Sequence, residues 1–105
     1  MNLADIINAI QIKRVNITQH ARQESRNDNL TLDEIFFSTI HGEIIEDYKE
    51  DKPYHSCLVN GETREGKPVH SVWAYAADSK IGILITVYCP DPNKWINWKT
   101  RREKL

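Results

Sequence analysis

Residues 82–92 read GILITVYCPDP, and this stretch decides the fold. Every second residue from position 81 to position 87 is β-branched, which predicts a strand with one face turned toward a core. These residues are Ile81, Ile83, Ile85 and Val87. The opposite face, with Leu84, Thr86 and Tyr88, is also partly apolar, so we expect the strand to lie in the middle of a sheet. The two prolines of CPDP cannot pair with a neighbouring strand, and they end it.

The length and composition are those of one ordinary soluble domain. The chain has 105 residues, of which 40% are hydrophobic and 28% charged, and we expect a single domain over residues 1–105. No apolar run approaches the roughly 18 residues that cross a membrane, and the N-terminus lacks the basic start and cleavage site of a signal peptide. Cys57 and Cys89 are too few for a disulfide framework. We therefore expect a cytoplasmic protein with buried free thiols and no membrane partner.

Charge is distributed unevenly along the chain, although the net charge is only −1. That balance argues against a general nucleic-acid coat protein, which is usually strongly basic. Residues 43–51 hold five acidic side chains and one lysine, whereas residues 91–105 hold five basic and two acidic side chains. We expect one end of the molecule to attract anions and the other to repel them.

Helix signals precede strand signals in this sequence. Three helices are expected, each with a capping residue at its start. They span Leu3 to about Lys13 after Asn2, Gln19 to about Asp28 after Thr18, and a segment from the Thr31–Glu34 capping box to Gly42. From Glu43 the apolar period changes to two, which predicts strands near 43–50, 55–60, 68–77 and 81–89. This order predicts an α+β fold with N-terminal helices packed on one face of a four-stranded antiparallel sheet, whose other face is open for binding.

Several short motifs occur in the order typical of a known family. They are ITQHAR at 17–22 with TLDEI at 31–35, GEIIEDY at 42–48, PVH at 68–70, and ITVY at 85–88 with PD at 90–91. Over about residues 14 to 102 the chain resembles the bacterial family known as domain of unknown function 4258. That family is itself similar to the RelE-like toxin ribonucleases, in which helices precede a curved antiparallel sheet.

The resemblance implies a RelE-like architecture and metal-independent cleavage of RNA, in which the ribose 2′-hydroxyl attacks the neighbouring phosphate. It implies no cofactor, and its partners would be RNA or the ribosome and an antitoxin protein. The sequence departs from the family where Glu24-Ser25 replaces arginine and methionine and Asp28-Asn29 replaces arginine and glycine. Because positive charges become negative, these changes weaken the attraction for RNA. They favour the alternative, a non-catalytic binding module that kept the scaffold and binds a protein partner.

Cleavage of RNA without a metal needs a proton acceptor, a proton donor and a cation over the phosphate. Four residues are candidates for the catalytic roles. His20 lies on a helix with little apolar surface and His70 lies in a strand, and an exposed imidazole can serve as acid or base. Their structural alternatives are a helix-orienting hydrogen bond for His20 and a satisfied, half-buried ring for His70. Tyr88 can donate a proton and Glu46 can orient an imidazole, unless they are a structural tyrosine and a solvated carboxylate.

Candidate substrate-binding residues are cationic or lie beside Tyr88. Arg101 and Arg102 offer forked, permanently charged donors to a phosphate, unless they belong to a frayed tail. Arg22 on the second predicted helix and Thr86, on the same strand face as Tyr88, complete this set.

The remaining polar and aromatic residues indicate no metal or cofactor site. Histidines and cysteines are too scattered for zinc, and no glycine loop suited to phosphates occurs. Neither serine nor cysteine sits in a nucleophile motif. Trp95 and Trp98 lie three residues apart, so we expect one helical face packed on the sheet, with base stacking as the alternative.

Overall fold

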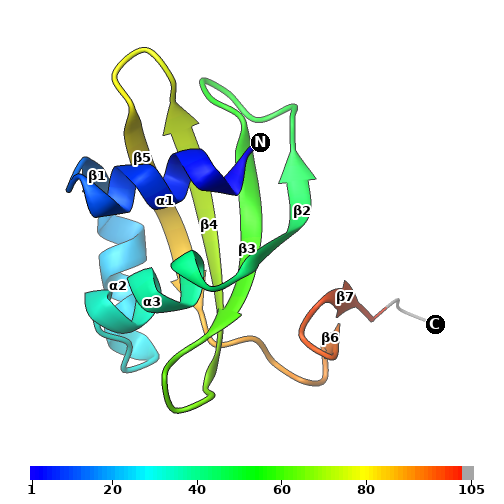
Figure 1. The fold of residues 1–105 in the computed structure, drawn as a ribbon. Coiled ribbons are helices and arrows are strands. Elements are labelled where there is room, and N and C mark those ends of the chain that lie inside the picture. Colours follow the sequence, from blue (N-terminus) through cyan, green and yellow to red (C-terminus); the bar gives the residue numbers. More distant parts are fainter. Residues whose placement is uncertain (103–105) are drawn as a thin grey trace.

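The computed structural model describes residues 1–102 and contains three helices and seven strands in that part of the chain (Figure 1). In chain order they are α1 (Leu3–Gln11), β1 (Val15–Ile17), α2 (Gln19–Asn27), α3 (Leu32–Ile40), β2 (Glu43–Tyr48), β3 (Ser56–Glu62), β4 (Pro68–Ala76), β5 (Ile81–Tyr88), β6 (Trp95–Ile96) and β7 (Thr100–Arg101). The predicted helices and strands are confirmed, with ends within two residues of those expected. None of these helices is long and apolar enough to cross a membrane. The end of the basic segment, residues 103–105, lies outside the described residues.

The main sheet has five strands in the order β1-β5-β4-β3-β2, and it is mixed rather than antiparallel. Strands β2 to β5 pair antiparallel, as predicted, but β1 pairs parallel to β5 with Val15 opposite Gly82 and Ile17 opposite Leu84. The prediction of a four-stranded antiparallel sheet is therefore wrong in this detail. Three residues are too short to show an alternating pattern, so β1 has no signal of its own. The expectation that β5 lies inside the sheet is confirmed, because β1 covers its outer edge.

Strand β5 contains a bulge that interrupts the alternation of its two faces. Leu84 pairs with Trp73 and Thr86 pairs with Val72, which leaves Ile85 as an extra residue in β5. Leu84 and Val87 are consequently both fully buried on the helix side. The predicted core face of β5 is wrong except at Val87. Before the bulge the face toward the helices carries Gly82 and Leu84, and the bulge then brings Val87 onto the same face.

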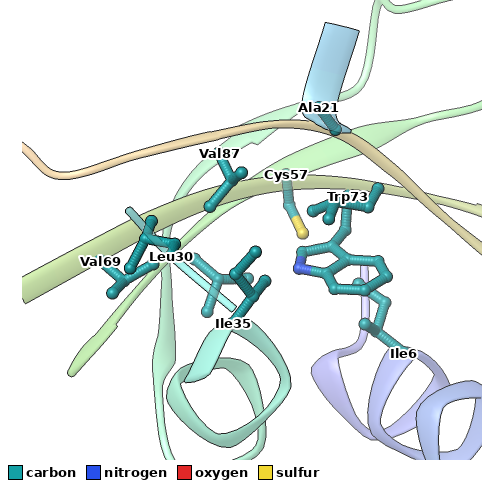
Figure 2. Packing of buried hydrophobic residues seen from close by; sticks show 10 residues of the cluster. Ile6, Ala21, Leu30, Ile35, Cys57, Val69, Trp73 and Val87 are labelled. Atoms are coloured by element: carbon teal, nitrogen blue, oxygen red, sulfur yellow. The ribbon is translucent and has the colours of Figure 1, made fainter. Parts of the chain in front are cut away.

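The hydrophobic core lies between the sheet and helices α1 and α3, which cross one of its faces (Figure 1). Figure 2 shows Ile6 of α1 and Ile35 of α3 on the same side of the sheet as Trp73, and all three side chains are fully buried. The Trp73 indole N–H donates to Ser71 Oγ at 3.0 Å and to Thr39 Oγ1 at 3.3 Å. An indole that is buried with its N–H hydrogen-bonded removes a large apolar area from water and leaves no polar group without a partner. Trp73 therefore stabilises the fold. Helices α1 and α3 cover this face, as predicted, whereas α2 packs against β5.

The helix starts follow the expected caps. Asn2 accepts from the backbone of α1 and Thr18 accepts from that of α2. Thr31 and Glu34 form the predicted capping box of α3. Gly42 follows the end of α3. A side chain does not fit at this position, because an added Cβ would lie 2.6 Å from backbone oxygens of α3 and β3.

After β5 the chain forms a two-stranded ribbon, β6 paired with β7, in which Trp95 lies opposite Arg101. Asn97 and Trp98 at its tip have φ angles of 52° and 65°, and a backbone hydrogen bond of 3.1 Å closes the turn. Two consecutive left-handed residues are the pattern of a type I′ hairpin turn. The expectation of a helix carrying Trp95 and Trp98 is wrong, because a left-handed backbone cannot continue a right-handed helix.

Candidate functional site between the sheet and the C-terminal ribbon

His70 is fully buried on the sheet face opposite the helices. Its neighbour Ser71 contacts α3, and successive strand residues point to opposite faces, so the imidazole points away from the helices. Its Nε2 lies 2.6 Å from the Trp98 carbonyl oxygen and its Nδ1 lies 3.2 Å from the Tyr88 hydroxyl. Since a carbonyl only accepts, Nε2 carries the proton and Nδ1 accepts the Tyr88 O–H.

Tyr88 lies opposite His70 in the sheet and lines a pocket of about 360 Å³ between the end of β5 and the ribbon. The walls combine the phenol with two cationic side chains and an indole. The lining residues are Tyr88, Cys89, Asp91, Lys94, Trp95 and Arg101. A phenol between a neutral base and a pocket with cations can pass a proton from the pocket to that base.

Arg101 ties the ribbon to strand β2. Its Nε donates to Glu46 Oε2 at 2.8 Å and its Nη2 donates to Glu46 Oε1 at 3.1 Å. The Tyr48 hydroxyl also donates to Glu46. The guanidinium lies 4.7 Å over the Trp95 ring, and Trp95 packs edge-on against His70 with ring centroids 4.5 Å apart. Glu46 takes two of the five N–H groups of the guanidinium, so others can meet a further acceptor.

The electrostatics of the site keep the Tyr88 phenol protonated and the His70 imidazole neutral. Burial lowers the pKa of His70, although the Trp98 carbonyl and the Glu46 carboxylate favour the charged ring. Burial raises the pKa of Tyr88. Burial acts to raise the pKa of Glu46, but hydrogen bonds from Arg101 and Tyr48 hold it below its ordinary value. At neutral pH the cluster therefore contains a neutral imidazole, a protonated phenol and a charged carboxylate.

The acidic and basic segments of the sequence meet at this site. Lys99 Nζ lies 2.8 Å from Glu43 Oε1, beside the pairing of Arg101 with Glu46. The expectation that the two segments lie at different ends of the molecule is wrong, because the ribbon returns to β2. Lys94 and Arg102 have no carboxylate within salt-bridge distance among residues 1–102. The positive charge that remains exposed on the ribbon is thus smaller than the sequence suggests.

Comparison with known proteins identifies the family. Residues 17–89 match the family described as Domain of unknown function (DUF4258), and this segment is more than half of the chain. The chain belongs to the DUF4258 family. No curated protein and no solved structure matches it. The DUF4258 segment ends at Cys89, so it includes His70 and Tyr88 but not the ribbon, which the expected span of 14 to 102 covered.

Within the DUF4258 segment, two of the residues expected from the sequence to depart from the family have structural partners. Asp28 Oδ2 accepts the Cys89 N–H at 2.8 Å, just after β5 ends. Lys67 Nζ donates to the Asp28 carbonyl oxygen at 3.1 Å. Ser25 is buried, and its hydroxyl donates to the Arg22 carbonyl oxygen at 2.8 Å. The acidic residue at position 28 therefore anchors the end of α2 beside the end of β5.

Four predicted site residues of this DUF4258 chain lie outside the cluster. His20 and Arg22 are exposed on α2, and no hydrogen bond or ion pair within residues 1–102 joins their side chains to it. Thr86 shares the open sheet face but does not line the pocket. Arg102 is exposed and lines a neighbouring pocket. The structure thus brings together His70, Tyr88, Glu46 and Arg101.

Sequence reasoning missed three contributors to the site. Tyr48 is two residues from Glu46, so the strand period could have placed both on one face. Lys94 gave no motif, and the Trp98 contribution is a backbone carbonyl, for which a sequence carries no signal. Within residues 1–102, histidines, cysteines and carboxylates form no group of three that could hold a metal ion.

Proposed function

We propose that the chain is a toxin-like RNA endonuclease of RelE-like architecture that cleaves through the ribose 2′-hydroxyl without a metal. The observation that carries the proposal is the Tyr88 phenol, which donates to the neutral Nδ1 of His70 and lines a pocket with Arg101 and Lys94. Helices that precede the antiparallel strands β2 to β5 are the arrangement that the RelE-like resemblance implies. RNA or the ribosome would be the substrate, and an antitoxin the protein partner.

The chemistry uses Tyr88 and His70 as a proton relay. The 2′-hydroxyl gives its proton to the Tyr88 oxygen while the phenol proton moves to His70 Nδ1. The 2′-oxygen then bonds to phosphorus, the bond to the 5′-oxygen breaks, and the leaving oxygen takes a proton from the Lys94 ammonium. The products are a 2′,3′-cyclic phosphate and a free 5′-hydroxyl. The Trp98 carbonyl and Glu46 favour the imidazolium that forms, and Arg101 stabilises the charge that develops on the phosphate.

Expression in a bacterial host tests this proposal. Wild type should slow growth and fragment RNA, and Tyr88→Phe should abolish both effects because it removes the hydroxyl of the relay. His20→Ala should behave like wild type, since His20 lies outside the cluster. Intact RNA and normal growth with well-expressed, folded wild type would refute the proposal.

The second candidate is the non-catalytic binding module. The observation that favours it is the Glu46 carboxylate, which already holds Arg101, as Glu43 holds Lys99. On this alternative the carboxylates of β2 hold the ribbon against the sheet, and the exposed face binds a protein. Glu46→Gln discriminates the two candidates. It should lower cleavage if the relay operates, because the Glu46 carboxylate favours the imidazolium that forms on His70, and it should only loosen the ribbon if no RNA is cleaved.

A further inference from the structure

Trp98 has a backbone conformation that is unfavourable for its residue type. Its φ of 65° is left-handed, and it follows Asn97 with a φ of 52° in the turn between β6 and β7. Glycine is the usual residue at this second turn position, and a bulky residue there is an outlier. Such strain persists where the surrounding structure imposes it, and it clusters at functional sites.

Trp98 lines two neighbouring pockets. One, of about 230 Å³, is lined by Pro92, Trp95, Asn97, Trp98 and Arg102. The other, of about 290 Å³, includes Trp98, Lys99, His41 and Asn60 among its walls. Trp95 also lines the pocket of Tyr88 and Arg101, so neighbouring pockets along the ribbon share a tryptophan at each step. Each pocket includes at least one cationic side chain, although Glu43 and Glu62 also line the pocket of Lys99, which leaves the net positive charge at the pockets of Lys94, Arg101 and Arg102.

The two tryptophans differ in what they can offer a ligand. Trp95 is buried between His70 and Arg101, and both of these neighbours contact its ring. Trp98 is only half-buried, and its backbone carbonyl, not its indole, serves His70. In the second pocket the Asn60 amide oxygen is buried without a hydrogen-bond partner among the described residues. Of the two tryptophans, Trp98 is therefore the one whose indole can stack on a base.

We infer that the ribbon is a binding track for single-stranded RNA, in which Trp98 stacks on the base next to the phosphate held at Tyr88. The inference rests on the proposed ribonuclease function and names the substrate form for that same site. Cationic side chains that alternate with aromatic ones are the usual means of holding a single strand, because the cations meet phosphates and the rings meet bases. Lys94, Arg101 and Arg102 supply the cations here.

The test measures binding to a fluorescein-labelled hexamer of 2′-O-methyl uridine, which cannot be cleaved. Trp98→Gly keeps the backbone carbonyl for His70 and suits the left-handed turn, so the fold should survive. Fluorescence anisotropy should show affinity weakened by about 5- to 150-fold, the effect of losing one base–aromatic stack. Trp98→Phe should retain most of the affinity. Ile96→Ala, an exposed change on the same ribbon, should leave it unchanged.

Cleavage of unmodified RNA, measured in parallel, separates the inference from the proposed function. Trp98-dependent binding without cleavage supports the inference and refutes the ribonuclease. Cleavage with equal affinity for the hexamer in wild type and Trp98→Gly supports the ribonuclease and overturns the inference. Absence of hexamer binding by wild type, or equal affinity for a blunt duplex of the same sequence length, also overturns it. Circular dichroism of each variant confirms that the comparison is between folded proteins.

Discussion

At the scale of single residues, His70 sets the geometry of the site because both of its ring nitrogens have partners on different elements. Nε2 donates to the ribbon at Trp98 and Nδ1 accepts from β5 at Tyr88. A buried polar ring is stable only when its hydrogen bonds are made, so the imidazole stabilises the docked position of the ribbon. The same ring is the proposed proton acceptor.

The lowered pKa of His70 predicts a pH dependence of stability. The folded protein resists protonation of the ring, whereas the unfolded chain takes up a proton near its ordinary value of about 6.5. The free energy of unfolding should therefore fall as the pH drops below about 6.5. The fall ends when the pH reaches the pKa of the ring in the folded protein. The groups that face the ring are Tyr88, Trp95, Glu46 and Arg101.

Urea denaturation at pH 7.5 and pH 5.5 measures this loss. His70→Gln should remove most of the difference between the two pH values, and His20→Gln should retain it because His20 is exposed on α2. An equal loss of stability in wild type and His70→Gln would assign the effect to another group.

Asp28 provides a second test among single residues. Asp28→Ala leaves the Cys89 N–H without its acceptor, and it should lower the free energy of unfolding by about 1–3 kcal/mol. Asp28→Asn retains a side-chain oxygen and should cost less. Chemical denaturation of both variants checks the ranking, and equal stability of Asp28→Ala and wild type would contradict the anchoring role.

At the scale of elements, the packing of α3 on β3 depends on a glycine. A Cβ added at Gly61 would lie 1.9 Å from the Ser38 carbonyl oxygen, so Gly61→Ala forces the helix and strand apart. We expect a loss of about 1–3 kcal/mol in unfolding free energy, as for an overpacked core. Gly66→Ala is the control, because nothing lies within 4 Å of its added Cβ and only its φ of 84° opposes the change. A melting temperature for Gly61→Ala above that of Gly66→Ala would contradict the close approach.

Elements with their own local signal were predictable from the sequence, and those that depend on distant partners were not. Caps and apolar spacing were enough for α1 and α3, the Thr18 cap indicated α2, and alternation was enough for β2 to β5. The parallel pairing of β1 and the bulge at Ile85 are set by tertiary contacts, so neither has a local pattern. The left-handed turn at Trp98 was missed because a tryptophan is not a turn residue.

The candidate site was predicted only in part, because some of its residues have a local signal and others depend on distant partners. His70, Tyr88 and Glu46 lie on strands whose alternation places them on one face, and the structure brings them together. His20 was selected because it is a histidine on a polar helix. The polarity of a helix does not indicate which face of a sheet the helix packs on. The pairing of Arg101 with Glu46 needed the path of the ribbon, which the sequence did not indicate.

At the scale of the whole molecule, the ribbon closes one end of the open sheet face through ion pairs with β2. These pairs are exposed, and such pairs contribute only about 0.2–1 kcal/mol each and weaken with salt. Amide hydrogen exchange in residues 93–102 should therefore accelerate in Glu46→Gln and at high salt, while the amides of β4 do not change. Unchanged exchange in the ribbon would show that the contacts of Trp95 alone hold it.

The central claim is that Tyr88 and His70 move the proton of a ribose 2′-hydroxyl at the pocket beside the ribbon. The most direct measurement uses a DNA oligonucleotide with one ribonucleotide, incubated with purified protein in the presence of a metal chelator and analysed by mass spectrometry. The account predicts cleavage only at the ribonucleotide, with a 2′,3′-cyclic phosphate product, and a rate at least about 100-fold lower for Tyr88→Phe. Cleavage by Tyr88→Phe at the wild-type rate, or an intact oligonucleotide with wild type that binds it, would contradict the account.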